Sequence, residues 1–385
     1  MLSVEGWPYA SSTAIEAGDP GRYYALFGRD SLITSLQILP ARPDVARATL
    51  RALAARQGRR DDPDSLEQPG KIGHEFRDFP PDTFTIRGWP DAGPFRYYGT
   101  ADATSWFLVL LDATGDRELA DELEPAWRAA AGWLRQALDD GDGLVRHTPG
   151  SGRGGLTQMG WRDAWDPTST RGMGVLRPDG TVPVPPLADA DTQAVTVAAL
   201  RAVGRLSGDT AWDERADRMR AQVTVTFLPD VMLVESDGRP VRGAGSQLGW
   251  LLWADAVDRS TVDAVAERLC RPDIATPFGL RTLSSAEPTF DVRAYHRGSV
   301  WPFDTWLGWG GLRAAGRTDD AEKLRRGVLE ALDRLGRYPE LYFVDSAGSL
   351  HAAPVANRVQ AWTVGARWAL EHEWDGRVNR EVRPG

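Results

Sequence analysis

Apolar residues recur at helical spacing along most of the chain. In residues 118–138, for example, Leu119, Leu123, Trp127 and Leu134 follow one another at three- and four-residue steps, which gives a helix one apolar face. Prolines and glycines break the pattern into pairs of segments, because their backbone preferences end helices. The pattern predicts five helical hairpins and one further helix: residues 30–39 with 44–57, 100–113 with 118–138, 191–206 with 210–227, 246–256 with 261–269, 299–315 with 319–335, and 357–372.

Long irregular stretches rich in glycine, proline and aspartate separate these hairpins. Within them we expect strands only at residues 231–236 and 239–242. Loops of this length in a compact domain are typical of functional segments. The stretches are residues 58–99, 139–189, 227–245, 271–298 and 336–356.

Helical hairpins that alternate with long loops predict an all-α toroid. The first helices of the hairpins would form an inner ring, the second helices an outer ring, and the long loops would gather at one mouth. A sixth pair would close the ring if residues 357–372 met an N-terminal segment such as residues 11–17. The sequence has no fixed-period repeat, which disfavours an open solenoid. We therefore predict an (α/α)6 barrel that forms one domain over residues 1–385.

Composition narrows the classes of partner. The 385 residues include 45 Lys and Arg against 54 Asp and Glu, a formal charge of −9, which argues against a nucleic-acid binder. No apolar stretch reaches the roughly 20 residues of a membrane span, and residues 1–12 do not resemble a signal peptide, so we expect a cytoplasmic protein. A single cysteine, Cys270, and five histidines without paired spacing predict neither a metal site nor a cofactor.

Carboxylates, arginines and tryptophans dominate the long loops. The sequence has no nucleophile elbow and no glycine-rich phosphate loop, whereas two carboxyl groups are what glycoside hydrolysis requires. Asp163 lies between Trp161 and Trp165, and an apolar wall there would raise its pKa and favour a proton donor, with Asp166 as the alternative. Glu340 stands in an aromatic turn and is the second candidate. The structural alternative for each is an ordinary capping or ion-paired residue, and the sixteen tryptophans fit either a core or a sugar-binding cleft.

Seven short strings occur in order near the predicted loop–helix junctions. Together they resemble the amylo-α-1,6-glucosidase family, the C-terminal module of glycogen debranching enzymes, within the glucoamylase-like set of (α/α)6 barrels. The strings are residues 27–33 (FGRDSLI), 70–77 (GKIGHEFR), 97–104 (YYGTADAT), 160–166 (GWRDAWD), 295–302 (YHRGSVWP), 339–341 (PEL) and 360–362 (QAW).

The resemblance implies an inverting exo-acting α-glucosidase. Asp163 matches the family's general acid and Glu340 its general base, while Arg29 and Asp30 match residues that hold the hydroxyls of the terminal sugar. The pocket wall and its stacking platforms would include Glu75, Arg77, Trp161, Trp165, Asp191, Gln193, His296 and Trp301.

Bacterial members of the resembled family usually carry a β-sandwich domain before the barrel; here Arg29 comes early, so we expect a barrel without that domain. A short α-glucoside, or a glucosylated small molecule such as a glycerate conjugate, is therefore an alternative to glycogen-type branches. Two further functions stay open on the same barrel. One is a sugar phosphorylase, lyase or epimerase, and the other is a carbohydrate-binding protein without turnover. The oligomeric state is left open.

Overall fold

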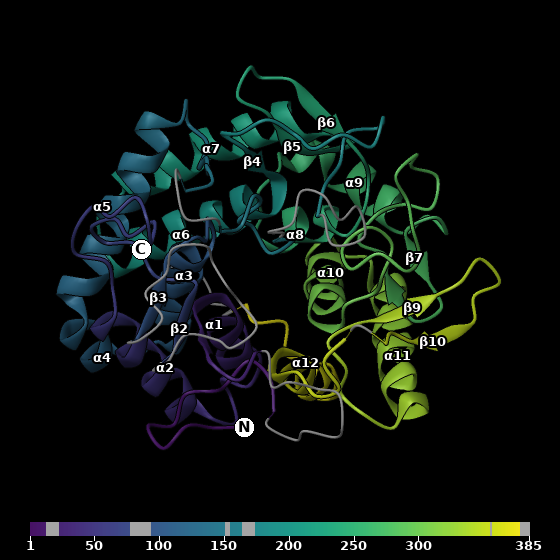
Figure 1. The fold of residues 1–385 in the computed structure, drawn as a ribbon, viewed down its shortest axis with the longest axis horizontal. Coiled ribbons are helices and arrows are strands. Elements are labelled where there is room, and N and C mark those ends of the chain that lie inside the picture. The colour runs from purple at the N-terminus through teal and green to yellow at the C-terminus, as the bar shows by residue number, and fades with distance from the viewer. Residues whose placement is uncertain (13–22, 78–93, 151–154, 164–173, 355, 378–385) are drawn as a thin grey trace.

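The computed structural model describes residues 1–12, 23–77, 94–150, 155–163, 174–354 and 356–377, and in that part the protein is mostly helical. Six helices each pack against the next, and the last also packs against the first. Figure 1 shows them around the centre of the molecule. They are α1 (Gly28–Gln37), α3 (Ala103–Thr114), α6 (Ala190–Ser207), α8 (Gln247–Trp253), α10 (Pro302–Ala314) and α12 (Ala361–Glu371).

The other helices lie outside this group and return the chain between successive inner helices. They are α2 (Pro43–Ala55), α4 (Arg117–Glu122), α5 (Glu124–Asp140), α7 (Ala211–Phe227), α9 (Val262–Leu269) and α11 (Thr318–Leu335). The inner and outer helices differ in how much of their surface is buried. Every residue of α1 is buried, whereas α2 and α5 bury only one face, because an inner helix has protein on all sides.

The five predicted hairpins are confirmed by contacts of α1 with α2, α3 with α5, α6 with α7, α8 with α9, and α10 with α11. One predicted helix, residues 118–138, is divided at Leu123, because Pro125 in the first turn of α5 lacks the amide that a continuous helix needs. Three others start three or four residues later than predicted, at Ala103, Pro302 and Ala361. Of the predicted sixth partner, Ser11 pairs with Gln360 in a β-bridge, and residues 13–17 lie outside the described residues.

Glycines allow two inner helices to approach closely. A Cβ on Gly249 of α8 would lie 2.6 Å from the Cα of Gly308 in α10, and one on Gly311 would lie 2.6 Å from the carbonyl oxygen of Gly249. Any larger side chain at these positions would force α8 and α10 apart.

Short antiparallel strands lie in the long connections, and most of them were not predicted. Only β5 (Val231–Val234) and β6 (Pro240–Arg242) match the expectation, and they continue a sheet that starts with β4 (Ala188–Asp189). The others are β1 (Leu26–Phe27), β2 (Glu75–Arg77) and β3 (Phe95–Tyr97) in one sheet, β7 (Ala275–Thr276) with β8 (Gly279–Leu280), and β9 (Tyr342–Val344) with β10 (Leu350–Ala352).

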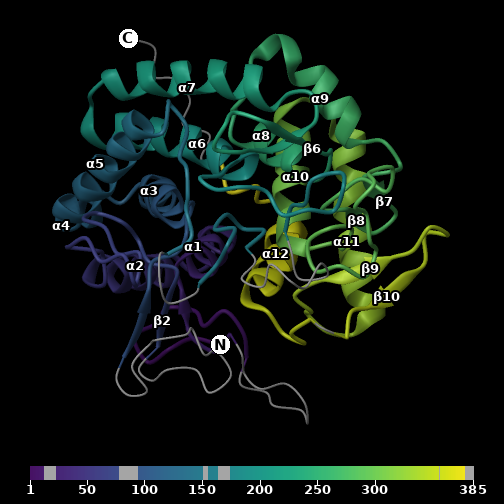
Figure 2. The ribbon, with the colours of Figure 1, turned by 45° about the horizontal axis from the view of Figure 1, so that its top comes forward.

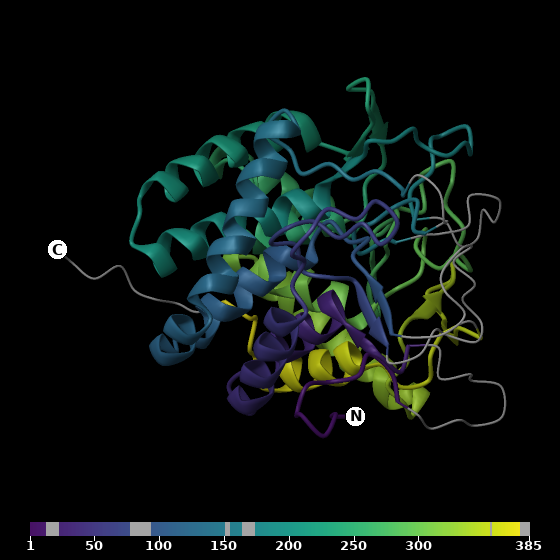
Figure 3. The same ribbon diagram turned by 60° about the vertical axis from the view of Figure 1, so that its left-hand side comes forward.

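The strands and the described parts of the long connections gather at one end of the helices. Figure 3 shows them on the right, opposite the turn between α6 and α7, and Figure 2 shows β7 to β10 together beside α11. Strands β1 and β4 run directly into α1 and α6, so this end is where inner helices begin.

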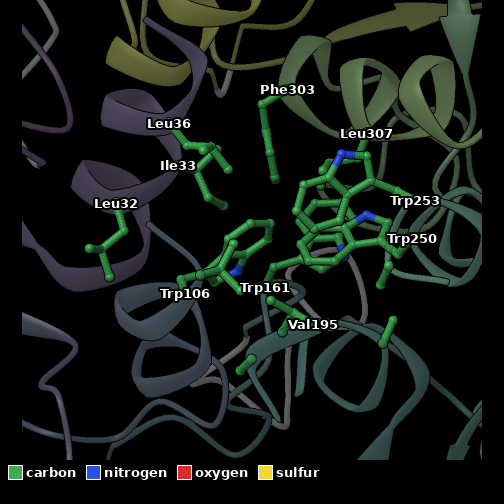
Figure 4. Close-up of a cluster of buried hydrophobic side chains, with 14 of the residues drawn as sticks. Leu32, Ile33, Leu36, Trp106, Trp161, Val195, Trp250, Trp253, Phe303 and Leu307 are labelled. Atoms are coloured by element: carbon green, nitrogen blue, oxygen red, sulfur yellow. The ribbon is translucent and has the colours of Figure 1, made fainter. Parts of the chain in front are cut away.

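Aromatic and aliphatic side chains fill the space between the inner helices. Figure 4 shows side chains of α1, α3, α6, α8 and α10 meeting there around Trp161, which is 1% exposed. The centre of the helical group is therefore a packed core rather than an open channel. None of the described helices has the length and apolarity needed to cross a bilayer.

Candidate active site

Charged side chains collect where the inner helices begin. Arg29 and Asp30 open α1, Asp102 precedes the first residue of α3, and Asp191 lies in the first turn of α6. Because an outer helix returns the chain each time, the inner helices all begin at the same end. Helix N-termini carry unpaired amides and a partial positive charge, which favours carboxylates there.

Arg29 joins two of these carboxylates. Its side chain is almost fully buried, and its Nη1 lies 3.1 Å from Oδ1 of Asp102 while its Nη2 lies 2.5 Å from Oδ2 of Asp163. Asp102 is itself inaccessible and also accepts a 2.8 Å hydrogen bond from the Thr100 hydroxyl. Asp102 therefore fixes the guanidinium, and the guanidinium holds Asp163.

Asp163 is the more accessible member of this group, with 25% of its side chain exposed. Nε2 of His74 lies 3.9 Å from its Oδ2, and burial keeps the pKa of His74 well below its usual value, so that imidazole is neutral. Burial also raises the pKa of Asp163 to about 6, although the charge of Arg29 opposes the shift. A carboxyl group with this pKa holds a proton in a useful fraction of molecules in mildly acidic to neutral solution.

Glu340 lies in the turn before β9 and is 3% exposed. The Tyr295 hydroxyl donates a 2.5 Å hydrogen bond to its Oε1, and the backbone amide of Asn357 donates a 3.3 Å bond to its Oε2. The backbone amide of Glu340 in turn donates to the carbonyl of Asn357 at 2.9 Å. Two separate loops therefore orient this carboxylate.

Asp30 connects the two predicted catalytic carboxyl groups. Burial raises its pKa to about 8, the charge of Arg29 opposes that shift, and the charges of Asp163 and Glu340 raise the pKa further. Asp30 is thus within electrostatic reach of both groups and holds a proton at neutral pH. Arg29 therefore pairs with Asp163, and Asp30 lies near enough to Asp163 and Glu340 for the charges of both to act on it.

Glu75 and Arg77 of β2 flank the same set. Glu75 is buried, forms an ion pair with Arg77, and has a raised pKa because of burial, with a smaller contribution from the charge of Asp163. The Arg77 guanidinium lies 5.9 Å from the centre of the Phe27 ring.

Two other predicted pocket residues make internal contacts. Asp191 forms an ion pair with Arg162, and Arg162 also donates a 2.8 Å hydrogen bond to the Ser246 hydroxyl. Burial raises the pKa of Asp191. Gln193 is inaccessible, and its side-chain amide bonds the backbone of Val145 in both directions, at 2.8 and 2.9 Å.

The predicted aromatic residues form a buried cluster. Trp161 and Trp301 are each 1% exposed, and the His296 ring lies parallel to Trp301 at 5.1 Å and edge-on to Trp161 at 5.4 Å. Burial keeps the pKa of His296 well below its usual value, so its ring is neutral. Trp165 and Asp166 lie outside the described residues.

Sequence reasoning missed Asp102, Tyr295 and Asn357 as members of this site. Asp102 and Tyr295 lie inside two of the strings that carried the family resemblance, and Asp102 stands just before an apolar helical run, a position that favours aspartate. Among the described residues, no group of three or more His, Cys, Asp or Glu side chains is arranged to hold a metal ion.

Comparison with known proteins assigns the family. The family model of the mannosylglycerate hydrolase MGH1-like glycoside hydrolase domain matches residues 23–363. The chain belongs to this family. It is therefore a glycoside hydrolase domain of MGH1-like type, rather than a specific member of the amylo-α-1,6-glucosidase family that its strings resemble.

Solved structures agree at the level of fold. The GH63 mannosylglycerate hydrolase from Thermus thermophilus, in complex with Tris and D-glycerate, has a TM-score of 0.69 at 18% identity, covering 96% of this chain and 97% of that chain. The same enzyme in complex with glucose has a TM-score of 0.64 at 19% identity, with 94% and 97% coverage. An uncharacterized conserved protein from Thermus thermophilus has a TM-score of 0.66 at 17% identity, with 96% and 98% coverage. No curated protein sequence matches the chain.

Proposed function

We propose that the chain hydrolyses a small α-glycoside by inversion, with Asp163 as the general acid and Glu340 as the general base. The observation that carries the proposal is that the two carboxyl groups are held in one region. Arg29 binds Asp163 at 2.5 Å, Tyr295 binds Glu340 at 2.5 Å, and His296, next to Tyr295, packs against Trp161 two residues before Asp163. A partly exposed carboxyl group with a pKa of about 6 suits the acid, and a carboxylate oriented by two donors suits the base.

In the proposed reaction, Asp163 gives its proton to the glycosidic oxygen as the bond to the anomeric carbon breaks. Glu340 takes a proton from the water that attacks that carbon from the opposite face, so the product sugar has the β configuration. The pair then returns to its starting state when Glu340 releases its proton and Asp163 regains one from solvent. Arg29 and the protonated Asp30 have hydrogen-bond donors for sugar hydroxyls.

The family favours a small substrate over a glycogen branch. Its description refers to mannosylglycerate hydrolase, and the Thermus thermophilus enzyme was crystallised with D-glycerate. We therefore propose α-mannosylglycerate, α-glucosylglycerate or a comparable short α-glycoside as substrate, with the sugar between Asp163 and Glu340.

A closed (α/α)6 barrel in a single domain is part of the proposal. It is supported by the packing of α12 against α1, and by the 2.8 Å hydrogen bond from the Ala361 amide to the carbonyl of Ala10, which brings the N-terminal segment to the start of α12. It is also supported by one apolar cluster whose members run from Trp7 to Leu370.

The test is a substrate panel read by proton NMR. The protein is incubated with α-mannosylglycerate, α-glucosylglycerate, maltose and isomaltose, and the anomer that forms first is recorded before mutarotation. We expect β-mannose or β-glucose from a glycerate conjugate, at a rate that added inorganic phosphate does not change. An α anomer formed first would refute the inverting mechanism, a sugar phosphate formed in the presence of phosphate would indicate a phosphorylase, and saturable binding without turnover would indicate a binding protein.

A further inference from the structure

The hydroxyl of Tyr295 points at the proposed base. Its 2.5 Å distance to Oε1 of Glu340 is typical of a hydrogen bond between a hydroxyl donor and an ionised carboxylate. Such a bond stabilises the charged form of the acceptor and restricts its rotation.

The position of Tyr295 is fixed by its surroundings. Its carbonyl oxygen accepts hydrogen bonds from the Ser299 hydroxyl at 2.5 Å and from the Trp301 indole at 3.0 Å. Its ring packs edge-on against His296 at 4.7 Å and against Trp301 at 4.9 Å. The ring therefore has little freedom to turn its hydroxyl away from Glu340.

We infer that Tyr295 is a positioning residue for the general base, which holds Oε1 of Glu340 so that the carboxylate faces the attacking water in one orientation. The inference rests on the proposed function, because it assigns Tyr295 a task only if Glu340 activates water. Burial raises the pKa of Tyr295 well above its usual value, and the charge of Glu340 raises it further, so the phenol remains a donor throughout the working range of a glycosidase.

The chain offers a matched control. Tyr342 of β9 is also a buried tyrosine, and its hydroxyl donates a 2.5 Å hydrogen bond to the carbonyl oxygen of Phe278 rather than to a carboxylate. Tyr295→Phe and Tyr342→Phe each remove one oxygen atom and its short hydrogen bond to an acceptor, although the Tyr295 hydroxyl also contacts the Tyr23 hydroxyl. Their kinetic differences therefore report what the Tyr295 hydroxyl does to Glu340.

We expect Tyr295→Phe to lower kcat by about 10- to 100-fold, the usual range for losing a hydrogen bond to a charged group, with less than about a threefold change in KM. A base becomes inactive as the pH falls through its pKa. Removal of the donor disfavours the ionised form of Glu340, so the acid limb of the rate profile should move to higher pH. Tyr342→Phe should lower the melting temperature and leave kcat and the acid limb unchanged.

A double variant tests whether Tyr295 acts through Glu340. If it does, Tyr295→Phe should cause little further loss of kcat in a Glu340→Gln background. If the phenylalanine variant does not fold, Tyr295→Met can replace it. Methionine also lacks a donor and its flexible side chain fills the space of the ring, so we expect the same loss of kcat and the same change of the acid limb. If the unmodified protein hydrolyses the glycoside and the Tyr295 variants have the same kcat and the same acid limb, this inference alone is overturned. The absence of hydrolysis by the unmodified protein would overturn the proposed function itself.

Discussion

Replacing Asp163 with asparagine tests the proposed general acid with little change of shape. The amide oxygen of asparagine can still accept the hydrogen bond that Arg29 donates to Oδ2, and Arg29 stays fixed by Asp102. What the variant loses is the proton. Loss of a general acid costs about 10²- to 10⁴-fold in rate.

The structure predicts how this loss depends on pH. With a pKa of about 6, Asp163 is protonated in about nine molecules in ten at pH 5 and in about one in ten at pH 7. The ratio of kcat/KM between the unmodified protein and Asp163→Asn should therefore be about tenfold larger at pH 5 than at pH 7. Any pH dependence that the two proteins share cancels in this ratio.

The assay measures kcat/KM of both proteins from pH 4.5 to 8 on the glycoside identified by the substrate panel. It is repeated on an aryl glycoside whose phenol leaves as an anion. The variant should lose much less rate on the aryl substrate, because that leaving group needs no proton. A ratio that does not change with pH, or near-normal turnover on the natural glycoside, would refute the assignment, and Asp166→Asn would then be the variant to examine.

Three other predictions concern neighbouring residues. Glu340→Gln should lower kcat by about 100-fold or more without changing the melting temperature, and a fully active variant would contradict its role as base. Arg29→Gln removes the cation that lowers the pKa of Asp163, so the basic limb of kcat/KM should move to higher pH, and an unmoved limb would contradict the coupling. Lys71 is buried with a pKa lowered to about 7, so Lys71→Met should stabilise the fold by about 1–4 kcal/mol at pH 6. Between about pH 7 and 10 the unfolded chain binds one more proton at Lys71 than the folded chain, so the unmodified protein gains stability as the pH rises. The stability difference between Lys71→Met and the unmodified protein, measured by urea titration, should therefore shrink over this range. A constant difference would count against burial as its cause.

The hairpins could be predicted because helical spacing extends over many residues. The start of α10 differed from the expectation because Pro302 fits only the first turn of a helix, a local rule that a periodic pattern does not contain. The strands of two to four residues, such as β1, are too short to show a period of two. Some of them form because segments far apart in sequence meet, as Leu26 does with Phe76, and others, such as β7 and β8, are short local hairpins.

The site was harder to predict than the helices. The sequence indicates which residues carry charge, but the ion pair of Arg29 with Asp163 joins positions 134 residues apart, and only the folded chain shows it. Tyr295 shows the same limit, because nothing near it in sequence indicates that its hydroxyl meets Glu340, 45 residues later. Trp301 is a different case, because the sequence suggested that it stacks on a sugar. In the fold it is almost completely buried, and its indole donates a hydrogen bond to the backbone carbonyl of Tyr295.

The common starting end of the inner helices divides the molecule into two regions with different tolerance to change. The turns at the opposite end, such as the one at Gly208 between α6 and α7, lie away from the proposed catalytic carboxyl groups, so we expect them to accept shortening, stiffening or immobilisation. If the proposed site is correct, substitutions in the connections that precede the inner helices should alter substrate choice. Engineering for heat tolerance and engineering for a new substrate can therefore proceed on separate surfaces of the same molecule.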